Sequence, residues 1–301
     1  MSELPYFTYD VFTDAPFGGG PLAVVDCRGL SATAPSTQLM QKIAAEFSLP
    51  ETTFIFEPDD SRHLAKVRIF TMAEELPMAG HPTIGTSLHL FSTIQSCPTQ
   101  FILELGVGPT AIDIEETDQT RAYMYQQPMQ NWHARAVDRI ALAASLGIAT
   151  EAIAEDSPLE FFSAGLTFLI VPITSRELLN SITPSQIDIG HVLKNSPSDR
   201  VYVFSVDDSD AQVLHTRMFN SDIRDMTEDP GTGSAAGALA HYLSQYCPER
   251  LADSKRVTIR QGFAMGRPSE ITISLVPNSD EVMVPRVGGS AWPIARGVLL
   301  L

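Results

Sequence analysis

The chain has 301 residues, 44% of them hydrophobic, which is enough to bury a large core in one large domain or in two of about 150 residues. Lys and Arg total 20 against 36 Asp and Glu, and the formal net charge of −16 opposes binding to a nucleic-acid backbone. Because no segment has the roughly 18 consecutive apolar residues of a membrane span, and no signal-peptide pattern opens the sequence, we expect a cytoplasmic protein without nucleic-acid or membrane partners.

An internal repeat is visible in the sequence. Residues 51–70, ETTFIFEPDDSRHLAKVRIF, read as an apolar strand, an acidic turn and a second strand ending in Arg-x-Phe, which is typical of a β-hairpin. The same order recurs in 199–219, DRVYVFSVDDSDAQVLHTRMF, at an offset of 148 that becomes 149. A weaker match links GGPLAVV at 19–25 to GLTFLIV at 165–171. We therefore expect two fused ancestral copies and two domains, connected near 125–139.

A second repeated feature follows each hairpin. HPTIGTSLHLF starts at His81 and DPGTGSAAGALAHYL at Asp229, again offset by 148, which pairs His81 with Asp229 and Pro82 with Pro230. A residue able to cap, placed before a proline, signals a helix N-terminus. Each loop therefore predicts the start of a buried helix. Helix starts offer unpaired N–H groups, so two of them facing one cleft would suit a carboxylate or an oxyanion.

The second of these loops, EDPGTGSAAGALAHYL at 228–243, has other interpretations. A phosphate-binding P-loop would need a Lys-Ser/Thr ending, and the glycines do not fit the G-x-G-x-x-G of dinucleotide sites. Ser234 is not flanked as in the G-x-S-x-G nucleophile elbow. A purely structural role, in which Asp229 only caps a helix and the glycines only permit close packing, stays open at this point.

Two titratable side chains are candidates for proton chemistry. His81 differs from Asp229 at the matching place of the repeat, as expected where a symmetric scaffold serves an asymmetric reaction, although a histidine satisfied by backbone groups fits equally well. Glu51 stands at the entrance of a strand. It is either solvated there or enters the cleft, where partial burial would suit a carboxylate that transfers protons. The remaining histidines show no ligand spacing, so no metal site is indicated.

Motifs spread over nearly the whole chain carry a resemblance to a known family. They are DVFTDAPFGGGPLAVV near the start, ETTF at 51–54, RIFTMAEELPMAGHPTIGTS at 68–87, EDPGTGSAAGALAHYL, and QGFAMGRPSEI at 261–271. In them the sequence resembles the phenazine-biosynthesis isomerase (PhzF-like) family, within the larger group with the diaminopimelate-epimerase-like fold.

The resemblance implies a fold and a domain division. The fold would be α+β, with two pseudo-symmetric domains, each a mixed, mostly antiparallel sheet wrapped around a central helix, and the active site between them. The N-terminal domain would comprise residues 1–126, with 290–301 returning to it, and the C-terminal domain residues 127–289. The resemblance also implies a homodimer and a place in secondary-metabolite biosynthesis.

The resemblance assigns roles to the candidate residues. Glu51 matches the family's acid/base glutamate, which removes a proton from carbon and returns it elsewhere on the substrate, and His81 and Asp229 match the residues that flank it. No cofactor is implied. Gly80 and Ser234 match positions that contact the substrate in the family. We expect the substrate to contact both helix starts, at Gly80, Pro82, Thr83, Gly231, Thr232, Gly233 and Ser234.

The sequence departs from the family pattern at two positions. Pro50 stands where the family usually has serine, which puts one hydrogen bond to the substrate in doubt. Gly20 replaces the asparagine of F-x-G-N-P, which would loosen an early loop.

The positions of the three cysteines argue against disulfides, a zinc site and two-thiol racemisation. Cys27, Cys97 and Cys247 are scattered and form no CxxC pair, so we expect neither a disulfide framework nor a zinc site. They also lie far in sequence from the two helix starts, where two-cysteine racemases of the larger group carry their thiols. Two-thiol racemisation is therefore disfavoured.

Three functional hypotheses follow from the sequence. The first is a cofactor-independent isomerase that moves a proton between carbons of a small metabolite bearing a carboxylate. The second is a lyase or cyclase that starts from the same proton abstraction. The third, suggested by Pro50 and Gly20, is a binding or interaction protein that kept the fold and lost the chemistry.

Overall fold

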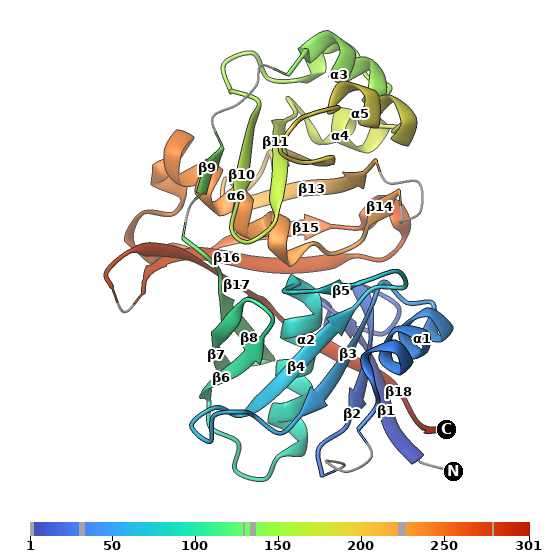
Figure 1. Cartoon of the computed structure of the whole chain (residues 1–301). Helices are drawn as coiled ribbons and strands as arrows, with labels where there is room; N and C mark the ends of the chain where they lie inside the picture. The colour runs from blue at the N-terminus through green and yellow to red at the C-terminus, as the bar shows by residue number, and fades with distance from the viewer. Residues whose placement is uncertain (1–2, 30–33, 129, 133–136, 222–226, 279) are drawn as a thin grey trace. The chain divides into compact units, whose positions relative to one another are not determined.

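Two compact units make up the structure, a computed structural model that describes residues 3–29, 34–128, 130–132, 137–221, 227–278 and 280–301. The first unit comprises Met1–Tyr125 with Gly288–Leu301, and the second Gln126–Val287 (Figure 1). The domain limits expected from the sequence stay a prediction. In the described part of the chain no helix is both long and apolar enough to cross a membrane.

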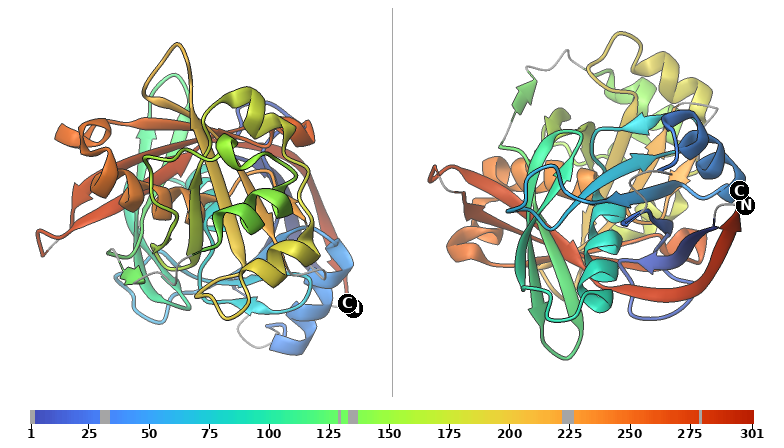
Figure 2. Two further views of the ribbon diagram at one scale, coloured as in Figure 1. Left: turned by 90° about the horizontal axis from the view of Figure 1, so that it is seen from above. Right: turned by 60° about the horizontal axis from the view of Figure 1, so that its bottom comes forward.

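The first unit is a mixed sheet with helices on both faces. Its strands are β1 (Glu3–Val11), β2 (Gly20–Asp26), β3 (Glu51–Phe56), β4 (Ala65–Phe70), β5 (Glu75–Leu76), β6 (Gln100–Leu105), β7 (Gly108–Glu116), β8 (Thr120–Tyr125) and β18 (Ala291–Leu300), and its helices are α1 (Thr37–Phe47) and α2 (Gly80–Thr93). The pairs β18/β1, β1/β2, β3/β4, β4/β5, β6/β7 and β7/β8 are antiparallel, and β2/β3 and β4/β6 are parallel. The right-hand view of Figure 2 shows the blue and green strands of this unit around α2.

The second unit repeats the same pairing pattern. Its strands are β9 (Gln130–Trp132), β10 (Glu160–Ser163), β11 (Thr167–Pro172), β12 (Arg200–Val206), β13 (Val213–Asn220), β14 (Glu228–Asp229), β15 (Val257–Gln261) and β16 (Ser269–Pro277). The helices are α3 (Arg139–Leu146), α4 (Arg176–Ser181), α5 (Gln186–Val192) and α6 (Gly233–Tyr246), with 3₁₀ turns η1 (Thr150–Ala152), η2 (Pro248–Arg250), η3 (Ala252–Ser254) and η4 (Phe263–Met265). Strand β17 (Met283–Gly289) crosses the limit between the units.

The order of ladders identifies the two units as copies of one fold. β10/β11, β12/β13, β13/β14 and β15/β16 are antiparallel, while β11/β12 and β13/β15 are parallel, as are their counterparts β2/β3 and β4/β6 in the first unit. Both predicted hairpins, β3/β4 and β12/β13, are present. The predicted fold class, two pseudo-symmetric α+β halves, is confirmed.

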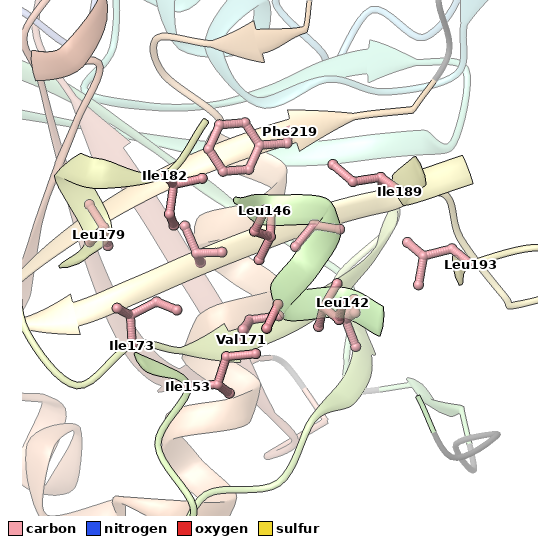
Figure 3. Packing of buried hydrophobic residues seen from close by; sticks show 14 of the residues in the cluster. Leu142, Leu146, Ile153, Val171, Ile173, Leu179, Ile182, Ile189, Leu193 and Phe219 are labelled. Carbon is pink, nitrogen blue, oxygen red and sulfur yellow. The ribbon is translucent and has the colours of Figure 1, made fainter. Parts of the chain in front are cut away.

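Strand alternation explains why helices cover both faces of the second sheet. On β11 and β12, Leu169, Val171, Val201 and Val203 belong to one buried cluster with residues of α3, α4 and α5 (Figure 3). On the opposite face of β12, the ring of Phe204 lies 5.6 Å from that of Tyr242 in α6. Strands covered on both faces become continuously apolar, as FLIVP and VYVF are here.

Helix α2 is the buried centre of the first unit. Eleven of its fourteen residues, from Gly80 to Leu90, are buried. Two of its buried hydroxyls bond to carbonyls one turn earlier, since Thr83 donates to the Ala79 carbonyl at 2.7 Å and Ser87 to the Thr83 carbonyl at 2.7 Å. A Cβ at Gly85 would lie 2.5 Å from the Leu22 side chain and 2.7 Å from that of Val11, so a larger residue would have to displace them, and glycine lets α2 approach the sheet closely.

The predicted helix starts were wrong in detail. His81 is the second residue of α2, whose N-cap is Ala79, and Asp229 lies in β14, before α6 begins at Gly233. Neither side chain caps a helix, and the counterpart of His81 in the second helix is therefore Ser234, not Asp229. The fixed offset failed because the connection from Phe219 to Glu228 is longer than the one from Phe70 to Glu75.

A buried histidine in α2 makes the stability of the fold depend on pH. His89 is fully buried, its Nδ1 lies 2.9 Å from the Tyr9 hydroxyl, and its ring centroid is 4.5 Å from that of Phe7. Burial lowers the pKa of His89 from 6.5 to about 4, because the low-dielectric interior disfavours the charged ring.

We expect the free energy of unfolding to fall as the pH drops from about 6.5 towards about 4, because there the unfolded chain binds a proton that folded His89 excludes. Between about pH 7.5 and about pH 5 this loss should be about 2 kcal/mol. Urea unfolding at both pH values measures it. The variant His89→Phe should lose about 2 kcal/mol less over the same interval, and an unchanged pH dependence would contradict the expectation.

Candidate active site

Glu51 and His81 form a close pair in the first unit. Side chains alternate along β3, so Glu51 and Thr53 point towards α2, while Phe54 packs in the cluster under α1. Glu51 Oε2 lies 3.2 Å from His81 Nε2, and the Thr53 and Thr86 hydroxyl oxygens are 2.8 Å apart on the same face. The Glu51 side chain is 17% exposed and that of His81 is 5% exposed, so the Glu51 side chain is the more accessible of the two, although its Oε2 atom is itself buried.

Gly20 lies beside the ring of His81. A Cβ placed on Gly20 would be 3.4 Å from His81 Cγ and 3.4 Å from Cδ2, so the backbone at the start of β2 lies against the imidazole. The parallel register of β2 and β3 sets Leu22 opposite Glu51 and so brings this segment to the same place. The departure from the family pattern at Gly20 is therefore located at the candidate site.

The first turn of α2 supplies the predicted substrate positions of this unit. Gly80, Pro82 and Thr83 are all buried in that turn with His81. The Thr83 hydroxyl donates to the Ala79 carbonyl, so it is engaged inside the helix. The first N–H groups of a helix have no partner within it, and they remain the groups of this turn that suit an anion.

Asp229 organises its own loop in the second unit. Its carboxylate accepts hydrogen bonds from the Thr232 hydroxyl and, at 3.3 Å, from the Gly231 N–H. Thr232 is the N-cap of α6 but makes no side-chain cap, because its hydroxyl is directed to Asp229. Gly233 and Ser234 are buried in the first turn of α6. The structure therefore gathers Asp229 and the predicted positions 231–234 in one loop.

Gln261 was not among the residues predicted from the sequence. This residue ends β15, is fully buried, and donates from Nε2 to the Asp229 carbonyl at 2.7 Å and to the Thr232 hydroxyl at 2.8 Å. A signal was present in the sequence. Val257, Ile259 and Gln261 alternate as inward positions of one strand, and a glutamine at such a position needs hydrogen-bond partners.

The same ion pair anchors the hairpin before each helix. Arg68 on β4 lies 2.5 Å from Glu75 on β5, and Arg217 on β13 lies 2.7 Å from Glu228 on β14. The first pair is 26% and 37% exposed, and the second is 8% and 13% exposed. Arg217 also donates to the Leu179 and Ile182 carbonyls. The equivalent pairs therefore differ mainly in burial.

In the described ranges of the chain, no group of three or more His, Cys, Asp or Glu side chains could hold a metal ion. Burial raises the pKa of the Cys27 thiol to about 12, with Asp26 adding to the shift, so this cysteine stays protonated at neutral pH.

Comparison with solved structures defines the class of the fold. The crystal structure of a phenazine biosynthesis protein of the PhzF family from Bacillus anthracis matches with a TM-score of 0.88, covering 100% of both chains at 24% identity. At that identity the match shows the fold alone. The chain therefore has the fold of the PhzF-type proteins.

Sequence comparison then identifies the family. The family described as phenazine biosynthesis-like protein matches residues 9–297. An uncharacterized isomerase of Mesorhizobium japonicum is 33% identical over 100% of both chains, and the trans-2,3-dihydro-3-hydroxyanthranilate isomerase of Pseudomonas chlororaphis is 30% identical over 98% of this chain and 99% of its own. The chain therefore belongs to the phenazine biosynthesis-like family, and the prediction that it is an isomerase of this family is confirmed.

The two anchoring ion pairs should contribute very differently to stability. Replacing Arg217 by Ala removes the partner of the largely buried Glu228 carboxylate and the side-chain donor to the Leu179 and Ile182 carbonyls, so we expect a loss of about 3–5 kcal/mol in unfolding free energy. Arg68→Ala is the matched control, with a loss of about 1 kcal/mol or less, because that pair is screened by solvent. Urea unfolding of both variants tests the difference, and equal losses would contradict it.

Proposed function

We propose that the protein is a cofactor-independent isomerase that moves a proton between two carbons of a small metabolite bearing a carboxylate. The observation that carries the proposal is the 3.2 Å approach of Glu51 Oε2 to His81 Nε2, with the Glu51 side chain partly exposed and the ring buried. A carboxylate accessible from one side and backed by an imidazole can accept a proton from carbon and give it back.

The proton transfer proceeds through Glu51. A substrate C–H bond breaks, its proton forms an O–H bond on the Glu51 carboxylate, and the electron pair is delocalised into the substrate's unsaturated system. The proton then returns to a different carbon, which restores the carboxylate, so the product is an isomer of the substrate. His81, buried beside the carboxylate, orients it and shares the proton between the two steps.

The helix starts stabilise the negative charge that develops on the substrate. N–H groups in the first turn of α2 and in the first turn of α6 would bind the substrate carboxylate, since both turns are buried and lack a side-chain cap. The substrate-contacting positions in this proposal are Gly80, Pro82 and Thr83 of the first unit and Gly231, Thr232, Gly233 and Ser234 of the second.

Asp229 completes the site in this proposal. Ionised carboxylates only accept hydrogen bonds, so Asp229 would hold a substrate amino or hydroxyl group. Trans-2,3-dihydro-3-hydroxyanthranilate, the compound in the names of relatives from three Pseudomonas species, has an amino group, a hydroxyl and a carboxylate, and we propose a substrate of this class. Two-thiol racemisation is not part of the proposal, because Ala79, Gly80 and His81 open α2 without a cysteine.

Glu51→Gln tests the proposal. We expect kcat on trans-2,3-dihydro-3-hydroxyanthranilate to fall by about 10²–10⁴-fold, because the amide cannot accept the proton. The control is Glu57→Gln, which changes an exposed carboxylate just beyond the same strand and should leave kcat unchanged. Product analysis separates an isomer from the fragments or rings of a lyase or cyclase, and unaltered turnover by Glu51→Gln would refute the role of Glu51.

A further inference from the structure

The duplicated fold allows the second unit to be compared with its own copy. The anchoring pairs make Arg68 equivalent to Arg217 and Glu75 to Glu228. The same strand register makes Pro77 equivalent to Pro230. A Cβ on Gly106 would lie 2.7 Å from the Pro77 Cα, and one on Gly262 would lie 2.7 Å from the Pro230 carbonyl oxygen. The residues just before these glycines, Leu105 and Gln261, therefore occupy equivalent positions.

In the second unit, Gln261 and four residues around it are connected by hydrogen bonds, and we call them the Gln261 network. It consists of Tyr202, Thr216, Asp229, Thr232 and Gln261. Gln261 Nε2 donates to the Asp229 carbonyl and to the Thr232 hydroxyl, and that hydroxyl donates to the Asp229 carboxylate.

The amide oxygen of Gln261 also has several hydrogen-bond donors around it. Its Oε1 lies 3.0 Å from the Tyr202 hydroxyl, 3.3 Å from the Thr232 nitrogen and 3.4 Å from the Thr216 hydroxyl. Four of the five side chains are buried, and only Asp229 is partly exposed. The network therefore connects the interior of the sheet to one accessible carboxylate.

The first unit forms the same fold without such a network. Its equivalent positions hold Thr53, Val67, Leu76, Ala79 and Leu105. The Thr53 and Thr86 hydroxyls share a hydrogen bond, and the other four residues have no side-chain group that can donate or accept one. Since apolar residues satisfy the fold there, folding alone does not require a buried glutamine and its partners, whose desolvation is costly.

We infer that Gln261 is a positioning residue that fixes the Asp229 carboxylate, through Thr232 and the Asp229 backbone, in the orientation used to hold the substrate. The inference rests on the proposed function for its catalytic consequence. Its structural part, the fixed Asp229 side chain, can be measured without any substrate.

The decisive variant is Gln261→Leu, which installs the residue type found at the equivalent Leu105. We expect kcat to fall by about 10–100-fold with KM changed less than about threefold, because a misplaced group costs rate while the substrate's carboxylate still binds. NMR couplings across the Asp229 Cα–Cβ bond should change from those of a single rotamer to averaged values. Gln212→Leu is the matched control, since Gln212 binds the Arg250 carbonyl elsewhere in this unit, and it should change neither readout.

The outcomes separate the two claims. An Asp229 side chain that keeps one rotamer in Gln261→Leu overturns the inference, whatever the activity. A second outcome is that Gln261→Leu shows averaged couplings while the wild type does not turn over trans-2,3-dihydro-3-hydroxyanthranilate. That outcome supports the positioning role and refutes the proposed function. Tyr202→Phe, which removes only one partner of Gln261 Oε1, covers the case in which Gln261→Leu does not fold. It should show the same changes to a smaller extent, and unchanged couplings in it would then overturn the inference.

Discussion

One constraint determines the structure of each half of the protein. The chain that leaves a short hairpin must enter the first turn of a buried helix in a fixed direction. Neither α2 nor α6 has a side-chain cap, so the turn before each helix is fixed by other means. An Arg–Glu pair anchors each hairpin, and a glycine lets the following strand pass within contact of the proline between hairpin and helix. The first N–H groups of both helices thereby keep a defined direction.

The two copies satisfy that constraint with different side chains, and this difference underlies the proposed chemistry. The first copy places His81 in the turn and sets Glu51 3.2 Å away, which suits a site that exchanges protons. The second copy surrounds the turn with hydrogen bonds that end at Asp229, which suits a site that holds and orients a substrate. A duplicated scaffold can thus divide binding and proton transfer between its halves.

Local patterns predicted the hairpins and the repeat, because alternation in 51–70 and 199–219 depends only on neighbouring residues. The equivalence of His81 and Asp229 failed, because a fixed offset cannot detect a longer connection between two strands. Glu51 and His81 were separate candidates until the resemblance linked them, since 30 positions of chain separate two side chains that only tertiary packing brings together. The role of Gln261 depends on the parallel pairing of β13 with β15, which no local pattern reveals.

The central claim is that Glu51 carries a proton from one carbon to another, and turnover in D₂O tests it most directly. Because the Glu51 side chain is partly exposed, its proton should exchange with solvent between the two steps. NMR and mass spectrometry of the product from trans-2,3-dihydro-3-hydroxyanthranilate should then find an isomer with deuterium at the carbon that gains the proton. A product that lacks carbon-bound deuterium, or that differs from the substrate in elemental composition, would contradict the account.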